Sequence, residues 1–250
     1  MTAQRDIFEV PQLQGSPASR FRILFHHTIL PLPSIPSKAI VRKAVTRIMA
    51  DQIRKPVILI LGIGDESQQH LTRADAESLM DLHPNPRGIF IPDTGITTEK
   101  NKAVTQQVIQ FVRAGGTAVF GAVFSSSIRP PDFDRYFEKS WSLPWKFAGY
   151  YRTTVFRNES SFGRPNSGLP ASYSQKAVNL KHVPRTSAWY LPDEDSVLES
   201  VVFGGAQIED KTQAPVVFLK VGEGWLGYTG DVNAEDGTTA VVLGMFRLLS

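Results

Sequence analysis

Apolar and polar positions follow one another in blocks along the chain, and the clearest blocks lie near its C-terminal end. Two apolar runs, Val216–Val221 and Trp225–Tyr228, flank the glycine-rich link Gly222–Gly224, which is a pattern typical of a β-hairpin. The polar cluster Thr229–Glu235 follows, and apolar residues then recur at helical spacing up to Phe246. We therefore expect a hairpin whose second strand leads through acidic residues into a helix.

Earlier in the chain, three short apolar runs have the pattern of buried strands. They are Val57–Leu61, Gly88–Ile91 and Thr117–Gly121, and the first is continuous in β-branched and aliphatic residues. Helical patterns follow the first two runs, and Gly115-Gly116 ends the second of these helices. Strand–helix repeats of this length predict parallel strands joined by right-handed crossovers.

The pattern changes near Ile128. Residues 128–170 are rich in aromatic residues, prolines and glycines, and a strand is expected within them at 151–156. Further short strands are expected at 178–183, 188–191 and 197–203. No clear linker precedes these strands, so we expect them to extend the same sheet. Residues 1–36, which prolines punctuate, are interpreted as an N-terminal arm, and residues 37–250 as a single domain with an aromatic-rich insertion at about 128–170.

Composition narrows the class of protein. The 250 residues are 42% hydrophobic and 20% charged, as in a soluble globular protein. The net charge is only +3, and basic residues gather between Arg20 and Lys55. The helix expected there, with Ser37 as its N-cap, has no aromatic residues between the basic ones, which favours a solvated face over a surface for nucleic acid or membrane. The N-terminal residues lack the apolar region of an export signal, and no run is long enough to span a bilayer. We expect a cytoplasmic protein that binds neither nucleic acid nor membrane.

The chain has no cysteine. Disulfides, zinc–thiolate sites, iron–sulfur clusters and a thiolate nucleophile are therefore excluded.

The order of these motifs resembles a known family. A strand leads to Asp65-Glu66, another ends in Pro92-Asp93, and the segments GGTAVFGAVFSS and, much later, GEGWLGYTGDVNAE follow. This order resembles the class I glutamine-amidotransferase-like superfamily, in particular its trehalose-utilisation (ThuA-like) branch and fungal proteins of that fold, over roughly residues 55–250. The resemblance implies an α/β fold: a flavodoxin-like, mostly parallel sheet with helices on both faces and an added β-hairpin.

The sequence departs from this family at the catalytic positions. Amidotransferases of the superfamily carry a cysteine in a sharp turn after the third parallel strand, and a histidine and a glutamate after a late strand. The matching turn here, Gly121–Ser126, has no cysteine, and the segment Gly230–Glu235 has no histidine, although Glu235 stands where the acid would be. The resemblance therefore implies the fold without glutamine hydrolysis.

Four carboxylates, Asp65, Glu66, Asp93 and Asp231, follow three different apolar runs. If those strands are parallel neighbours, the carboxylates meet at the carboxyl edge of the sheet, where α/β proteins bind ligands. Asp65, Asp93 and Asp231 would then serve as general acid and base, or the group would hold Mg²⁺ or Ca²⁺. The simpler interpretation, that each aspartate binds the amides of the following helix, is favoured for each one singly. We assign no metal and no cofactor.

Ser125 lies in the nucleophile turn and is the candidate hydroxyl nucleophile. An activated serine needs a base, and neither a G-x-S-x-G motif nor a histidine in a motif context is present. A hydrogen bond from the serine to loop backbone is therefore favoured. Polar residues and a glycine at the strand ends are predicted to contact a ligand: Gly64, Glu66, Thr94, Tyr228, Asn233 and Glu235.

Two functions remain open at this point. The favoured one is a catalytically divergent module that binds a small molecule or assembles with a protein partner, with the aromatic residues of 128–170 forming either a contact surface or a minor core. The alternative is a hydrolase, lyase or isomerase with a rebuilt carboxylate site, acting on a small polar metabolite. The sequence leaves a homo-oligomer open.

Overall fold

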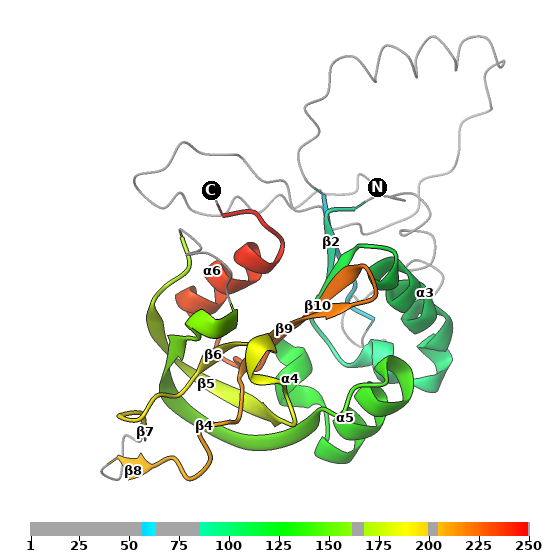
Figure 1. Ribbon diagram of the computed structural model, residues 1–250. Coiled ribbons are helices and arrows are strands. Elements are labelled where there is room, and N and C mark those ends of the chain that lie inside the picture. Colours follow the sequence, from blue (N-terminus) through cyan, green and yellow to red (C-terminus); the bar gives the residue numbers. More distant parts are fainter. Residues whose placement is uncertain (1–56, 64–85, 162–167, 200–204, 250) are drawn as a thin grey trace, which may run out of the picture. The chain divides into compact units, whose positions relative to one another are not determined.

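The computed structural model describes residues 57–63, 86–161, 168–199 and 205–249 (Figure 1). The chain divides into two units between Leu59 and Ile60, and nearly all described residues belong to the second. The predicted N-terminal arm and the candidate residues Gly64, Asp65 and Glu66 lie outside the described residues. The predicted domain boundaries therefore stay a prediction.

Among the described residues, eight strands form one mixed sheet in the order β1-β2-β3-β10-β9-β6-β4-β5. Strand β3 pairs in parallel with β2 and β10, whereas the pairs β10–β9, β9–β6, β6–β4 and β4–β5 are antiparallel. Strands β7 and β8 form a separate two-stranded sheet. The bounds are β1 Ile58–Ile60, β2 Gly88–Ile91, β3 Thr117–Phe120, β4 Lys146–Arg157, β5 Ser172–Lys181, β6 Ala188–Leu191, β7 Val197–Leu198, β8 Ala206–Gln207, β9 Val216–Val221 and β10 Gly224–Thr229.

The α/β class is confirmed, and the strands expected at 151–156, 178–183 and 188–191 overlap β4, β5 and β6 of the same sheet. The strand expected at 197–203 does not extend it, because Val197–Leu198 (β7) pairs with β8 in the separate sheet, and residues 200–203 lie outside the described residues. The sheet is mixed, however, so the expectation of a mostly parallel sheet is wrong, and the flavodoxin-like arrangement is not confirmed. The physical reason lies in the connections. Parallel neighbours need a crossover of a dozen residues or more, usually a helix, and the described residues between β4 and β10 contain no α-helix.

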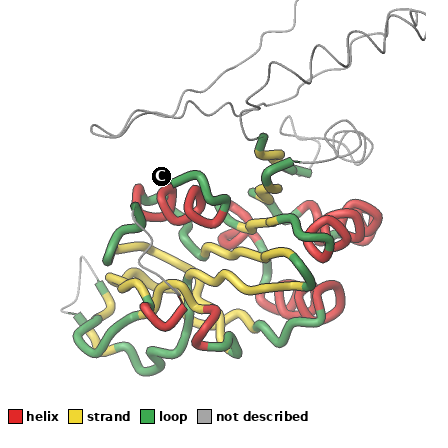
Figure 2. Tube along the Cα trace, turned by 45° about the horizontal axis from the view of Figure 1, so that its top comes forward, coloured by secondary structure: helices red, strands yellow, loops and turns green. Residues whose placement is uncertain are grey.

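Helices lie on both sides of the strands (Figure 2). On one face, α6 packs against β10 and β3, since a side chain at Gly227 would meet both Met245 of α6 and Val119 of β3. On the other face, Phe120 and Tyr228 contact the rings of α4, α5 and the π-helical segment η3. The bounds are α3 Lys102–Arg113, α4 Val123–Ser127, α5 Pro130–Tyr136, η3 Phe137–Trp141 and α6 Asp236–Met245, with 3-10 turns η1 Gly95–Thr97, η2 Glu99–Asn101, η4 Glu159–Ser161 and η5 Arg185–Ser187. Among these described helices, none has the length and apolar character that crossing a bilayer requires.

The aromatic residues of the predicted insertion form a core. Phe133 and Phe137 lie 4.5 Å apart between ring centroids, and Trp145 packs against Phe137 at 5.1 Å. These three rings are fully buried, so they are not available as a contact surface. Among the described residues of this stretch, the aromatic side chains of Tyr150 and Phe156 are exposed, at 51% and 36%.

The outer edge of β5 is covered by the segment Gly230–Glu235, which we call the rim loop. The Val178 amide donates to the Gly230 carbonyl at 2.9 Å, and the Val232 amide donates to the Lys176 carbonyl at 3.0 Å. This pairing fixes the loop after β10 against a strand that lies four places away in the sheet order. The rim loop, which contains the predicted ligand contacts Asn233 and Glu235, thus forms backbone hydrogen bonds with the edge strand β5.

Candidate functional site at the carboxyl edge of the sheet

The carboxyl ends of β2, β3 and β10 lie side by side because these three strands are parallel neighbours. Asp93 follows β2, α4 follows β3 and Asp231 follows β10. The loops touch: the Phe124 amide donates to the Pro92 carbonyl at 2.7 Å, and the Ser125 hydroxyl donates to the Thr229 carbonyl at 2.7 Å. The structure therefore brings Asp93, Ser125 and Asp231 to one edge, as parallel strands require.

Asp93 is buried and binds backbone amides. Its Oδ1 accepts from the Gly95 amide at 2.8 Å and from the Ile63 amide at 3.2 Å. The carboxylate thereby connects the loop after β1 to the turn after β2. The neighbouring Thr94 contributes its carbonyl, which accepts from the Thr97 amide and hydroxyl.

Asp231 organises the rim loop. It is only 2% exposed, its Oδ1 accepts from the Asn233 amide at 2.8 Å, and its Oδ2 accepts from the Glu235 amide at 2.7 Å. Short polar side chains that bind amides two to four residues ahead stabilise such turns locally. The interpretation favoured from sequence was that this carboxylate caps the following helix. Instead, the amides that it binds belong to the loop and to the N-cap residue Glu235 of α6.

The hydroxyls of Ser125 and Tyr228 are both buried and directed at backbone. Ser125 donates to Thr229, as above, and Tyr228 donates to the Val178 carbonyl at 3.2 Å. Burial raises the pKa of the Tyr228 phenol above its ordinary value. The Ser125 hydroxyl thus joins α4 to the end of β10, and the Tyr228 hydroxyl joins β10 to β5.

The sharpest backbone feature of the edge is at Ala122, between β3 and α4. Its φ of 53° and ψ of −133° lie in a region that residues with a side chain rarely adopt. A strained turn from strand to helix is where α/β hydrolases hold their nucleophile exposed above the sheet. Here the exposed residue on the turn is an alanine, which has no nucleophilic atom.

Sequence reasoning located this turn within Gly121–Ser126 but chose Ser125 as its reactive residue. The structure places Ser125 three residues beyond the strained position and buries it in α4. The only local signal at this turn was Gly121 directly after the strand, where a Cβ would lie 2.5 Å from Thr229 Oγ1 and would force that side chain to move.

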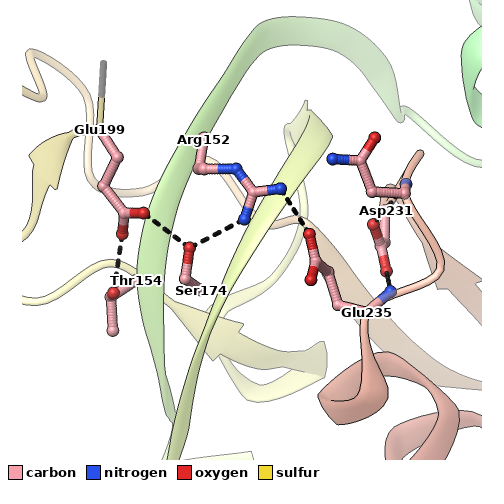
Figure 3. Close-up of polar contacts among 7 residues, drawn as sticks. Arg152, Thr154, Ser174, Glu199, Asp231 and Glu235 are labelled. Carbon is pink, nitrogen blue, oxygen red and sulfur yellow. Dashed lines mark hydrogen bonds and ion pairs between the residues drawn. The ribbon is translucent and has the colours of Figure 1, made fainter. Parts of the chain in front are cut away.

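A chain of polar side chains extends from the rim loop over β5 and β4 (Figure 3). Arg152 of β4 donates through Nη1 to the Ser174 hydroxyl at 3.1 Å and through Nη2 to Glu235 Oε1 at 2.5 Å. Glu199 accepts from the hydroxyls of Ser174 at 2.7 Å and Thr154 at 2.8 Å. The Arg152 and Glu235 side chains are 31% and 28% exposed, so solvent reaches both charges.

Sequence reasoning found only one member of this polar chain, Glu235. Arg152 and Glu235 are separated by 83 positions and come together only because the rim loop pairs with β5. The single signal in the sequence was the alternation of polar residues along β4 and β5, which marks a strand face open to solvent.

The residues in place do not form an evident metal centre. Within the described ranges, no group of three or more histidine, cysteine, aspartate or glutamate side chains is placed to hold a metal ion.

Comparison with known proteins gives only a distant likeness of fold. No family model and no curated protein matches the chain. Among solved structures, a β-galactosidase from Bacillus circulans sp. alkalophilus matches with a TM-score of 0.41 at 11% identity, over 76% of this chain and 30% of that chain. A putative ThuA-like protein from Bacteroides uniformis matches with a TM-score of 0.42 at 12% identity, over 80% of this chain and 94% of that chain. A GH42 β-galactosidase from G. stearothermophilus, in a catalytic mutant form, matches with a TM-score of 0.37 at 15% identity, over 82% of this chain and 32% of that chain.

A ThuA-like protein is thus among the structural neighbours. The chain spans about a third of the length of each of these two β-galactosidases. At TM-scores below 0.5 these likenesses carry no argument about ligand or reaction, and the α/β class rests on the sheet itself.

Proposed function

We propose that this chain is a catalytically divergent member of the class I glutamine-amidotransferase-like superfamily, which binds a small polar molecule at the carboxyl edge of its sheet and has no amidotransferase activity. The observation that carries the proposal is Ala122 on the strained turn after β3. The turn has the geometry of a nucleophile elbow, and its residue supplies no atom that can attack a carbonyl.

The retained strain supports a role for the turn other than catalysis. A non-glycine residue in such a conformation costs roughly 1–3 kcal/mol and persists only where its surroundings impose it. The Phe124 amide donates to both the Pro92 and the Gly121 carbonyls and so holds the turn from two sides. The exposed residues Ala122 and Val123 are thereby fixed at the edge, as a preformed ligand contact requires.

Binding of a small molecule is favoured over assembly with a protein partner because Phe133, Phe137 and Trp145 are buried, which leaves Tyr150 and Phe156 as the exposed aromatic side chains among the described residues of this stretch. The rebuilt-enzyme alternative needs a carboxylate directed at a substrate. Both oxygens of Asp231 already accept backbone amides, which argues against that residue as a general acid or base.

The test uses the full chain and a panel of small polar metabolites. Thermal shift identifies compounds that raise Tm, and mass spectrometry of the incubated mixtures detects turnover. We expect binding without product, and we expect binding to be lost in Val123→Arg, because Val123 is 55% exposed beside the turn and can be enlarged without disturbing the core. Gln110→Arg, on the exposed side of α3, is the matched control and should bind as the wild type does.

Formation of a product from any panel compound would contradict the proposal. Loss of that turnover in Asp231→Asn, with the fold retained by circular dichroism, would favour the rebuilt enzyme instead.

A further inference from the structure

Two cationic side chains face each other across β4 and β5. Arg152 and Lys176 are register partners in this antiparallel pair, so their side chains stand on the same face of the sheet. Like charges placed directly opposite each other destabilise a strand pair. Departures of this kind from local rules are expected where a surface is shaped for function.

The two charges are compensated in different ways. Arg152 contacts Ser174 and the carboxylate of Glu235, which comes from the rim loop (Figure 3). Lys176 lies with its Nζ over the Tyr150 ring, 5.1 Å from the centroid, and forms no ion pair with any described residue. Since Tyr150 is half exposed, the Lys176 ammonium is presented beside open surface.

We propose that Arg152 and Lys176 form a binding site for the anionic group of a small ligand, a carboxylate or a phosphate, and that Glu235 occupies Arg152 when no ligand is bound. The inference rests on the proposed function, because it names the chemical class of the ligand and places its anionic group beside the rim loop, which follows β10 at the carboxyl edge. The guanidinium supplies a planar fork suited to two oxygens, and Lys176 supplies a second charge from the opposite strand.

The surroundings favour exchange of Glu235 for a ligand oxygen. Ion pairs between partly exposed side chains are weak, so a ligand anion loses little by replacing this one. Ser174 orients the guanidinium from the other side, and Glu199 in turn holds the Ser174 hydroxyl. Asp231 holds the backbone amide of Glu235, so the loop keeps its place when the side chain leaves.

The experiment is a calorimetric titration of the full chain with inorganic phosphate and, separately, with succinate, at low ionic strength. We expect at least one probe to bind, and binding to weaken as salt is added. Arg152→Gln and Lys176→Gln should each weaken binding about tenfold, as expected for loss of a charged hydrogen bond. Glu235→Gln should tighten binding by up to about fivefold, since it removes the internal competitor.

Lys102→Gln is the matched control, because Lys102 belongs to an exposed ion pair with Glu99 at the start of α3. It should bind each probe as the wild type does. If Arg152→Gln lowers Tm, Arg152→Lys keeps the charge and should retain weakened binding. Binding of inorganic phosphate indicates a phosphate ligand, and binding of succinate indicates a carboxylate ligand.

Equal binding by wild type, Arg152→Gln and Lys176→Gln would overturn the inference, as would the absence of binding in both the wild type and Glu235→Gln. The two proposals fail separately. If Arg152→Gln and Lys176→Gln bind a panel compound with the same affinity as the wild type, the protein still binds a small molecule, but Arg152 and Lys176 do not form its anion site.

Discussion

Gly230 lies so close to Val178 that a Cβ at position 230 would stand 1.9 Å from the Val178 carbonyl oxygen. The neighbouring amide of Val178 donates to the Gly230 carbonyl, and the Tyr228 hydroxyl donates to that same Val178 carbonyl. The close approach of Gly230 to Val178 therefore joins the end of β10 to the edge strand β5. The position of the rim loop, and of Glu235 within it, depends on the absence of a side chain here.

Gly230→Ala should destabilise the protein by about 1–3 kcal/mol, as overpacking does when backbone must shift. Urea unfolding followed by circular dichroism measures the change. Glu223→Ala, in the exposed turn between β9 and β10, is the control and should leave the midpoint unchanged. An unchanged midpoint in Gly230→Ala would mean that the rim loop is not fastened to β5 in solution.

Asp231→Ala should lower the free energy of unfolding by about 1–3 kcal/mol, because two backbone amides lose their buried acceptor. Asn233→Ala is a matched control, since Asn233 takes part in the turn only through its backbone amide. Chemical denaturation of the two variants side by side makes the comparison. Equal stability of Asp231→Ala and Asn233→Ala would contradict the role given to the carboxylate.

The short buried strands could be predicted from sequence almost to the residue. Strands β2, β6 and β9 have the expected bounds because each is a compact apolar run between clear breaks. Strands β4 and β5 begin five or six residues earlier than expected, at Lys146 and Ser172. One face of this pair carries polar side chains such as Arg152 and Ser174, so a search for continuous apolar runs misses much of both strands.

The candidate site was less predictable. Asp93 and Asp231 were found because acidic residues after parallel strands are a local pattern, and the parallel order of β2, β3 and β10 brings them to one edge. Ala122 gives no chemical signal in a sequence, since its importance lies in a dihedral angle. The contact between Arg152 and Glu235 depends on the register of β5 with both β4 and the rim loop, which no local pattern specifies.

Alkaline pH should destabilise the fold through tyrosines whose phenol groups are buried or half-buried. Burial is the largest cause of raised pKa values at five of them, and the pKa reaches about 12 at Tyr136 and Tyr151. The folded pKa lies above the ordinary value of 10, so the neutral phenols stabilise the fold fully below pH 10, and this contribution is lost as the pH rises through 12. The same direction holds for the other three, Tyr173, Tyr190 and Tyr228.

The measurement is the near-ultraviolet absorbance of tyrosinate against pH, with circular dichroism recorded in parallel. We expect most ionisation to coincide with unfolding, well above pH 10. The matched control is the same titration in concentrated urea, where the tyrosines should ionise near their ordinary pKa. Ionisation of five or more tyrosines near pH 10 in the folded protein would contradict the burial described here.

Ala122→Gly should stabilise the protein, against the usual effect of introducing glycine. The positive φ of Ala122 strains the backbone by roughly 1–3 kcal/mol, and glycine adopts this region without that strain. Against this gain stands the greater freedom of glycine in the unfolded chain, about 0.4–1 kcal/mol. We therefore expect a net gain of up to about 2 kcal/mol in the free energy of unfolding, measured by urea denaturation.

Ala114→Gly supplies the control of opposite sign. Ala114 is the C-cap of α3 with an ordinary φ of −84°, so glycine there has no strain to relieve and should lower stability. Destabilisation of both variants by similar amounts would show that position 122 is not strained in solution. In that case the proposed function would lose the observation that carries it, the strained turn at Ala122.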